Sequence, residues 1–124
     1  MAVWVLAVVL SQAAAVKAKA TAASPTLKLI RATELRTLLI DVSLTEDLGD
    51  LIISHPEMDI FKPNGRYYYS HIGKREGTFE VRKSRVCVSI GRNSTCFRLL
   101  RDETGAVWRK DPDRDVYRVA IKPF

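Results

Sequence analysis

The chain has 124 residues, of which 20 are Lys or Arg, 14 are Asp or Glu and 47% are hydrophobic. This length fits one domain and excludes a two-domain enzyme. The mixed composition excludes collagen and coiled coils. Two cysteines are too few for a disulfide-rich scaffold or a four-thiolate zinc site.

The first 20 residues have the layout of a secretory signal peptide. An apolar run at residues 2–10 precedes an alanine-rich stretch with A-x-A patterns, as at residues 18–20. The run is shorter than the roughly 20 apolar residues that cross a bilayer, so no permanent membrane anchor is expected. No Lys or Arg precedes the run, which leaves a buried N-terminal helix or a start further upstream as alternatives. We expect cleavage near Ala20, one domain at residues 21–124, and a periplasmic or secreted location.

A short helix is predicted at residues 32–40. Leu35, Leu38 and Leu39 recur at helical spacing and share one face. The following segment, residues 41–57, is acidic and is interpreted as irregular, with Gly49 and Pro56 as breakers. Residues 51–53 form a possible short strand within it.

From residue 58 onward the hydrophobic period changes to two. Asn64-Gly65, Lys83-Ser84, Gly91-Arg92 and residues 102–105 are turn signals between short strands. The predicted strands are residues 58–61, 66–69, 78–81, 86–90, 95–99, 106–108 and 116–121. The predicted fold class is therefore mainly β with one short N-terminal helix: an antiparallel meander of six to seven strands that forms a small barrel or curved sheet.

The two central turns define a register for three strands. With two-residue turns at Lys83-Ser84 and Gly91-Arg92, Cys87 lies opposite both Glu80 and Cys96. Directly opposed residues are close enough for a disulfide. We expect a structural Cys87–Cys96 bond in an oxidising compartment. A redox-active pair and free buried thiols are the alternatives, but there is no C-x-x-C motif.

The same register separates an apolar face from a basic one. Tyr69, Phe79, Val88 and Phe97 are candidate residues of an apolar pocket. On the other face, Arg82, Arg85 and Arg98 form a row across three strands, where like charges repel. Three interpretations stay open: solvated side chains, pairing with acids of the 41–59 segment, or a bound anion at this candidate anion-binding site.

The overall charge pattern is also uneven. Residues 34–59 carry seven acids and one base, whereas residues 60–101 carry ten bases and two acids. An anionic polymer or an acidic protein surface is a possible partner. The three tyrosines at residues 67–69 have basic neighbours, as in stacking surfaces for nucleic acid. Alternate strand residues face opposite ways, however, so no nucleic-acid partner is expected.

Catalytic and metal-binding patterns are mostly missing from the sequence. His55 and His71 are isolated and are interpreted as loop residues. Residues 111–115 match the start of a calcium loop but depart from it at Val116 and Lys122, so a charged turn is favoured. Asn93 begins a glycosylation triplet at a tight turn. We predict no catalytic residues, no metal and no cofactor.

The segments at residues 59–67, 76–81, 86–88 and 96–99 contain an F-x-x-[DN]-G-x-Y hairpin, a G-T-[FYW]-x-[VI] strand and two cysteines on neighbouring strands. In these motifs the chain resembles a loose group of small exported bacterial β-rich proteins of unknown function. The resemblance implies a periplasmic or secreted, lipocalin-like small barrel and carries no catalytic residue.

The sequence therefore predicts an exported, non-enzymatic β-domain that binds a partner or an anionic envelope component. The alternative is a carrier of a small apolar ligand, with a pocket inside the curved sheet. A cavity of roughly 300 Å³ or more inside the meander would favour the carrier. A filled interior with an uncovered arginine row would favour the anionic partner.

Overall fold

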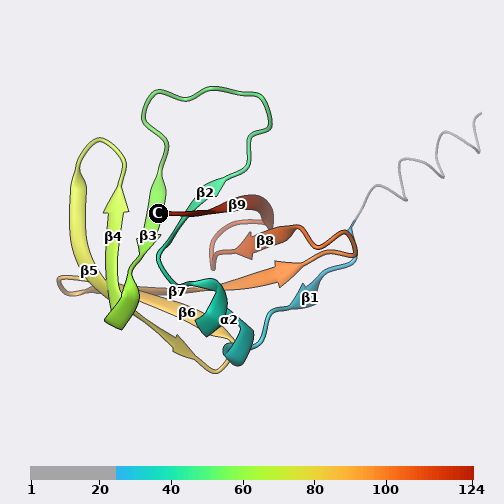
Figure 1. The fold of residues 1–124 in the computed structure, drawn as a ribbon, viewed down its shortest axis with the longest axis horizontal. Coiled ribbons are helices and arrows are strands. Elements are labelled where there is room, and N and C mark those ends of the chain that lie inside the picture. The colour runs from blue at the N-terminus through green and yellow to red at the C-terminus, as the bar shows by residue number, and fades with distance from the viewer. Residues whose placement is uncertain (1–24) are drawn as a thin grey trace, which may run out of the picture.

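The computed structural model describes residues 25–124, and the predicted signal peptide lies outside them. Eight antiparallel strands form a closed barrel, and one further strand, β1, pairs along β7 (Figure 1). The nine strands are β1 Lys28–Leu29, β2 Val42–Glu46, β3 Met58–Phe61, β4 Arg66–Ser70, β5 Lys74–Arg82, β6 Arg85–Ile90, β7 Asn93–Arg101, β8 Val107–Lys110 and β9 Tyr117–Pro123. Each strand from β2 to β8 pairs with the next one, and β9 pairs back with β2. The predicted antiparallel, lipocalin-like small barrel is confirmed, but with nine strands in place of the predicted six to seven, because β1 and β2 add to the predicted set.

One short helix, α2 (Ala32–Leu38), lies at one end of the barrel (Figure 1). Leu35 and Leu39 are fully or almost fully buried and belong to the same apolar core as Phe61 and Phe97. The helix ends two residues before the predicted boundary, because Asp41 adopts a positive φ of 55° that turns the chain into β2. No helix within residues 25–124 is long and apolar enough to span a bilayer.

The predicted register of β5, β6 and β7 is confirmed. Cys87 pairs with Glu80 on one side and with Cys96 on the other. The Cys87–Cys96 disulfide joins Cα atoms 4.0 Å apart. Gly91, Lys83 and the Asn64-Gly65 pair have the positive φ values that these tight turns need. A short 3-10 segment of three residues, η1 (Pro63–Gly65), includes the last of these turns.

Two expectations for the acidic segment are wrong. Its start forms strand β2 rather than irregular chain, because Val42 and Leu44 alternate with polar residues and pair with both β3 and β9. Residues 51–53 form no strand: they belong to the long β2–β3 loop, and Ile52 is 94% exposed. An apolar run without a neighbouring strand has no partner for its backbone N–H and C=O groups.

The pairing places alternate residues of every barrel strand inside. Near α2 the interior is filled by buried apolar side chains, including Phe61, Val86, Phe97 and Leu99. The ring of Phe61 contacts those of Tyr67, Phe79 and Phe97, with centroids 5.0 to 6.4 Å apart. Toward the opposite end the inward positions become polar, at Glu46, Asp59 and Arg109. The barrel therefore has one packed end and one polar end.

Candidate binding site in the barrel mouth

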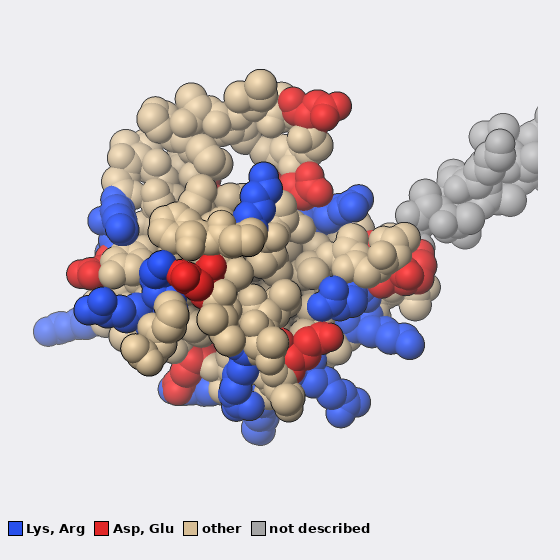
Figure 2. Space-filling model, viewed as in Figure 1, with Lys and Arg blue, Asp and Glu red and all other residues tan. Residues whose placement is uncertain are grey.

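A cavity of about 590 Å³ is lined in part by the β2–β3 loop. This loop lies at the end of the barrel opposite α2 (Figure 1). The walls of the cavity are inward positions of the barrel strands, and its rim is formed by the β2–β3 loop, His71 and the β8–β9 connection. The β2–β3 loop, residues 47–57, arches over a hollow and presents a largely uncharged surface (Figure 2). The apolar lining residues are Leu44, Leu48, Ile53, Pro56, Tyr67, Tyr69, Val88, Ile90 and Tyr117.

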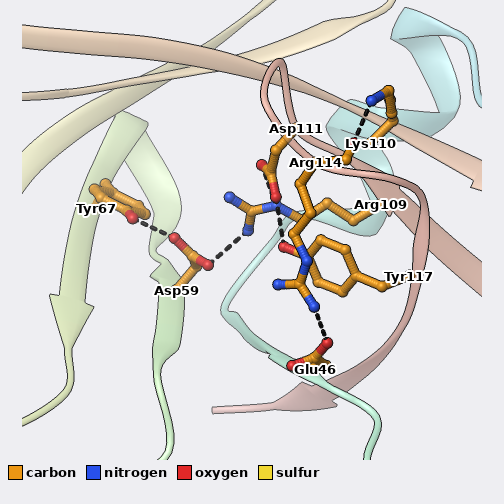
Figure 3. Close-up of polar contacts among 8 residues, drawn as sticks. All are labelled: Glu46, Asp59, Tyr67, Arg109, Lys110, Asp111, Arg114 and Tyr117. Atoms are coloured by element: carbon orange, nitrogen blue, oxygen red, sulfur yellow. Dashed lines mark hydrogen bonds and ion pairs between the residues drawn. The ribbon is translucent and has the colours of Figure 1, made fainter.

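Arg109 lies at the centre of the polar lining. It projects inward from β8, where it pairs with Leu99 of β7 and Tyr117 of β9. Its Nη1 donates to Asp59 Oδ2 at 2.7 Å, and its Nε donates to Asp111 Oδ1 at 2.9 Å (Figure 3). Its side chain is only 12% exposed. Burial lowers the pKa of Arg109, but the two carboxylates outweigh that effect and raise it, so the guanidinium stays charged.

Beneath the guanidinium lies an aromatic ring. The Arg109 Cζ atom is 3.8 Å from the centroid of the buried Phe97 ring. A cation held over the face of an aromatic ring is attracted by its negative face. Arg109 is therefore fixed by two ion pairs and a stacking contact, and its position depends on β3, β7 and β8 together.

Two tyrosines complete the hydrogen bonding of the carboxylates. The Tyr67 hydroxyl donates to Asp59 Oδ1, and the Tyr117 hydroxyl donates to Asp111 Oδ2 at 2.7 Å (Figure 3). Burial, followed by the charge of Asp59, raises the pKa of Tyr67 well above its ordinary value. Burial, followed by the hydrogen bond to Asp111, raises the pKa of Tyr117 likewise. Both phenols therefore stay neutral donors and are unsuited to act as bases near neutral pH.

A second layer of contacts lies nearer the rim. Arg114 forms an ion pair with Glu46, and its Cζ is 3.7 Å from the centroid of the Tyr117 ring. The Lys110 ammonium donates to the Arg114 carbonyl oxygen. These contacts tie the β8–β9 connection to β2 (Figure 3). On the side of the cavity that carries Tyr117, the chain is thus held by one ion pair, one cation–aromatic contact and one hydrogen bond.

We define the floor cluster as Asp59, Tyr67, Arg109, Asp111 and Tyr117. It contains two carboxylates for one guanidinium, so it has one excess negative charge. The excess is partly buried, because the side chains of Asp59 and Asp111 are 13% and 24% exposed. The floor cluster can bind and orient a polar group, and its two phenols are held as neutral hydrogen-bond donors.

The sequence-predicted pocket residues have two different positions. Tyr69 and Val88 line the cavity. Phe79 and Phe97 share the inner face but pack into the apolar core instead. Burial, and then the hydrogen bond with Glu57, raises the pKa of the Tyr69 hydroxyl above its ordinary value. The structure therefore brings half of the predicted set to the cavity and the other half beneath it.

The two histidines and the acidic turn do not form a metal-binding group in the described part of the chain. His55 and His71 are exposed residues at the cavity rim. Within residues 25–124, no group of three or more His, Cys, Asp or Glu side chains is placed to hold a metal ion. In the calcium-loop candidate, the carboxylate of Asp111 is already used by Arg109 and Tyr117.

The predicted row of three arginines lies on the outside of the barrel, away from this cavity. Arg82, Arg85 and Arg98 are all exposed. Arg82 pairs directly with Arg85 in the β5–β6 ladder, and Arg82 alone of the three has a carboxylate contact within the described chain, to Glu80. The acids of the 41–59 segment bind other cations: Asp41 binds Lys62, Glu46 binds Arg114, Asp47 binds Arg118 and Asp59 binds Arg109. No ion pair within residues 25–124 joins this row to that segment.

Sequence reasoning missed the floor cluster. Val107, Arg109, Tyr117 and Val119 alternate in phase, so Arg109 could have been recognised as an inward cation once β8 and β9 were paired. Asp59 and Arg109 are 50 residues apart, and only barrel closure brings them together. Comparison with protein-family models, with curated proteins and with solved structures finds no match to this chain.

Proposed function

We propose that the protein is a non-enzymatic carrier that binds a small amphipathic molecule in the mouth of the barrel. The observation that supports this most strongly is the cavity of about 590 Å³, which lies within the size range of small-molecule sites. It exceeds the roughly 300 Å³ at which small-molecule sites begin. A filled interior would have supported the partner-binding alternative instead.

The lining favours a ligand with one apolar part and one polar part. Leu48 and Ile53 of the β2–β3 loop line the same cavity as Val88 and Ile90 of β6. The polar atoms converge on the floor cluster. An apolar chain would be buried between the loop and β6, and the polar group would contact the floor.

The charge of the floor favours a cationic polar group. Arg109 neutralises only one of its two carboxylate partners. Uncompensated charge in a partly buried site is costly, and an ammonium group from the ligand would remove that cost. The rings of Tyr67, Tyr69 and Tyr117 also line the cavity, and tyrosine faces attract cations. An alkyl carboxylate would meet repulsion at the same place.

Two further features support a role outside the cytoplasm. The chain contains the Cys87–Cys96 disulfide, and disulfides persist mainly in oxidising compartments. The sequence pattern of residues 1–20 predicts export. We therefore propose that the carrier works in the periplasm or after secretion.

The test is isothermal titration of the protein with octylammonium and with octanoate, which share one apolar chain. We expect octylammonium to bind at least about tenfold more tightly. Thr95→Trp should abolish binding, because Thr95 lines the cavity. Ser94→Trp is the matched control, because Ser94 directly precedes Thr95 on β7 and faces outward. This variant should bind octylammonium as the wild type does. Equal binding by the two variants would contradict the cavity site, and tighter binding of octanoate would contradict the cationic ligand.

A further inference from the structure

A row of four cations crosses the outer wall of the barrel. We define the basic row as Arg82 on β5, Arg85 on β6, Arg98 on β7 and Lys110 on β8. Arg82 pairs with Arg85, and Arg98 pairs with Lys110. Arg85 directly precedes Val86 and Arg98 directly follows Phe97, so the Val86–Phe97 pair places Arg85 across from Arg98 in the same register. Each member of the row therefore faces a like charge on the neighbouring strand.

Such an arrangement costs stability unless something relieves the repulsion, because directly opposed like charges destabilise a sheet. Within residues 25–124, Arg85 and Arg98 have no carboxylate within 4.0 Å. Lys110 contacts the carbonyl of Arg114, which cancels no charge. Only Arg82, at one end, is paired with an acid. The middle of the basic row is left with uncompensated positive charge.

The same place is concave. A hollow of about 300 Å³ is lined by Arg85, Arg98 and Lys110, with Cys96, Phe97 and Pro112 beside them. Asp111 also lines it, but its two carboxylate oxygens are engaged by Arg109 and Tyr117 on the inner side. Three cations thus surround a depression large enough for an anionic group.

The disulfide holds this wall in shape. Cys87 and Cys96 lie on the outer face of the same two strands that carry Arg85 and Arg98. A covalent link between β6 and β7 fixes the separation of the two arginines before any ligand arrives. Preorganisation of this kind reduces the cost of binding.

We propose that the basic row binds a linear polysaccharide that carries an anionic group on successive sugars. Neighbouring strands are about 4.8 Å apart, so four strands place four cations along about 14 Å, which suits a polymer with repeated charges. The ring of Phe97, the one aromatic residue of the hollow, is 2% exposed, which leaves no face for a nucleic-acid base to stack on. The disulfide also fits an oxidising compartment, and extracellular polysaccharides occur in such compartments.

The test measures binding of heparin, a sulfated linear polysaccharide, by the full exported chain. The double variant R85Q/R98Q should weaken heparin binding by at least about tenfold. The matched control R66Q/R92Q removes the same charge from exposed positions outside the row and should weaken binding by less than about threefold. Equal losses in the two variants would mean that only net charge attracts heparin, and would overturn the site.

Two further readouts keep the result clear. R85Q/R98Q should melt at the same temperature as the wild type or higher, because it removes repulsion, so a loss of binding cannot be attributed to unfolding. Its titration with octylammonium should be unchanged, which separates the basic row from the cavity. Binding of single-stranded DNA as tightly as heparin, at equal salt, would overturn the choice of polysaccharide.

Discussion

At the scale of single residues, Arg109 links the interior of the barrel to its proposed function. Its guanidinium is 12% exposed and is held by Asp59, by Asp111 and by the ring of Phe97. Removing one partner of a buried ion pair leaves an uncompensated charge behind, whereas removing all partners does not. The behaviour of variants therefore depends on which members of the floor cluster change together.

Arg109→Leu should lower the free energy of unfolding by about 3 kcal/mol, because it leaves two carboxylates facing each other in a partly buried site. Adding Asp59→Asn and Asp111→Asn to this variant should restore most of the loss. Urea denaturation followed by circular dichroism measures both effects. A triple variant no more stable than Arg109→Leu would show that the ion pairs are not the cause.

Tyr67 gives the molecule a dependence on alkaline pH. Its pKa is raised in the folded protein, so the unfolded chain releases this proton near pH 10 while the folded chain keeps it. The contribution to stability is fully present below that pH and is lost as the pH rises further. We expect the free energy of unfolding to fall by up to about 1 kcal/mol per pH unit from this group, after allowance for solvent screening.

Tyr67→Phe should flatten this alkaline decline, measured by urea denaturation between about pH 8 and pH 11. It should also cost about 1 to 2 kcal/mol at neutral pH, through the lost hydrogen bond to Asp59. Tyr68→Phe is the control, since it changes the next side chain on the outer face and keeps the Tyr67–Asp59 contact. A decline equally steep in Tyr67→Phe and in the wild type would contradict the assignment.

At the scale of elements, the sequence predicts the hairpins well because their determinants are local. Gly91 begins a two-residue turn, and that turn sets which residues of β6 and β7 face each other. Asn64-Gly65 also marks a turn, but the loop there has three residues, Pro63–Gly65, so Phe61 pairs with Tyr67 rather than with Tyr68. The disulfide prediction follows from the register of β6 and β7. Strand β2 was missed because its partners β3 and β9 are distant in sequence and its flanks are acidic. The floor cluster was missed for the same reason, since no local pattern connects Asp59 with Arg109.

Gly77 marks the point where β5 passes from its pairing with β4 to its pairing with β6. A Cβ atom at this position would lie 2.1 Å from the carbonyl oxygen of Ser89. Backbone atoms cannot move aside as a side chain does, so Gly77→Ala should destabilise the protein by about 1 to 3 kcal/mol. Gly73→Ala is the control, because a Cβ there meets nothing within 4 Å. Equal thermal midpoints for the two variants would contradict the close approach of β5 and β6.

At the scale of the whole molecule, closure of the sheet is what makes a cavity possible. The apolar rings around Phe61 fill the end near α2, and the same barrel is polar and open at the other end. The sequence predicted a small barrel or a curved sheet, and could not decide between them because the pairing of β2 with β9 spans the chain. The loop residues at the open end, such as Ile52 and Ile72, stay exposed in the structure.

The intact mass of the secreted or periplasmic protein tests the predicted processing. We expect the mass of residues 21–124, within a few residues of the Ala20 boundary. Complete reduction should add two hydrogen atoms, because Cys87 and Cys96 are the two cysteines of the sequence and are joined. A full-length mass, or a mass that reductant does not change, would contradict export or the disulfide respectively.

The barrel closes only when β9 reaches β2, and the N–H of Phe124 then donates to the carbonyl of Asp41 at 2.9 Å. Contacts between such distant parts of a chain form slowly. During synthesis, a nascent chain that still lacks β9 is an open sheet, in which β2 pairs only with β3 and β8 pairs only with β7. For an exported protein this delay is useful, because a translocation channel threads an unfolded chain, and folding would then be completed on the far side of the membrane.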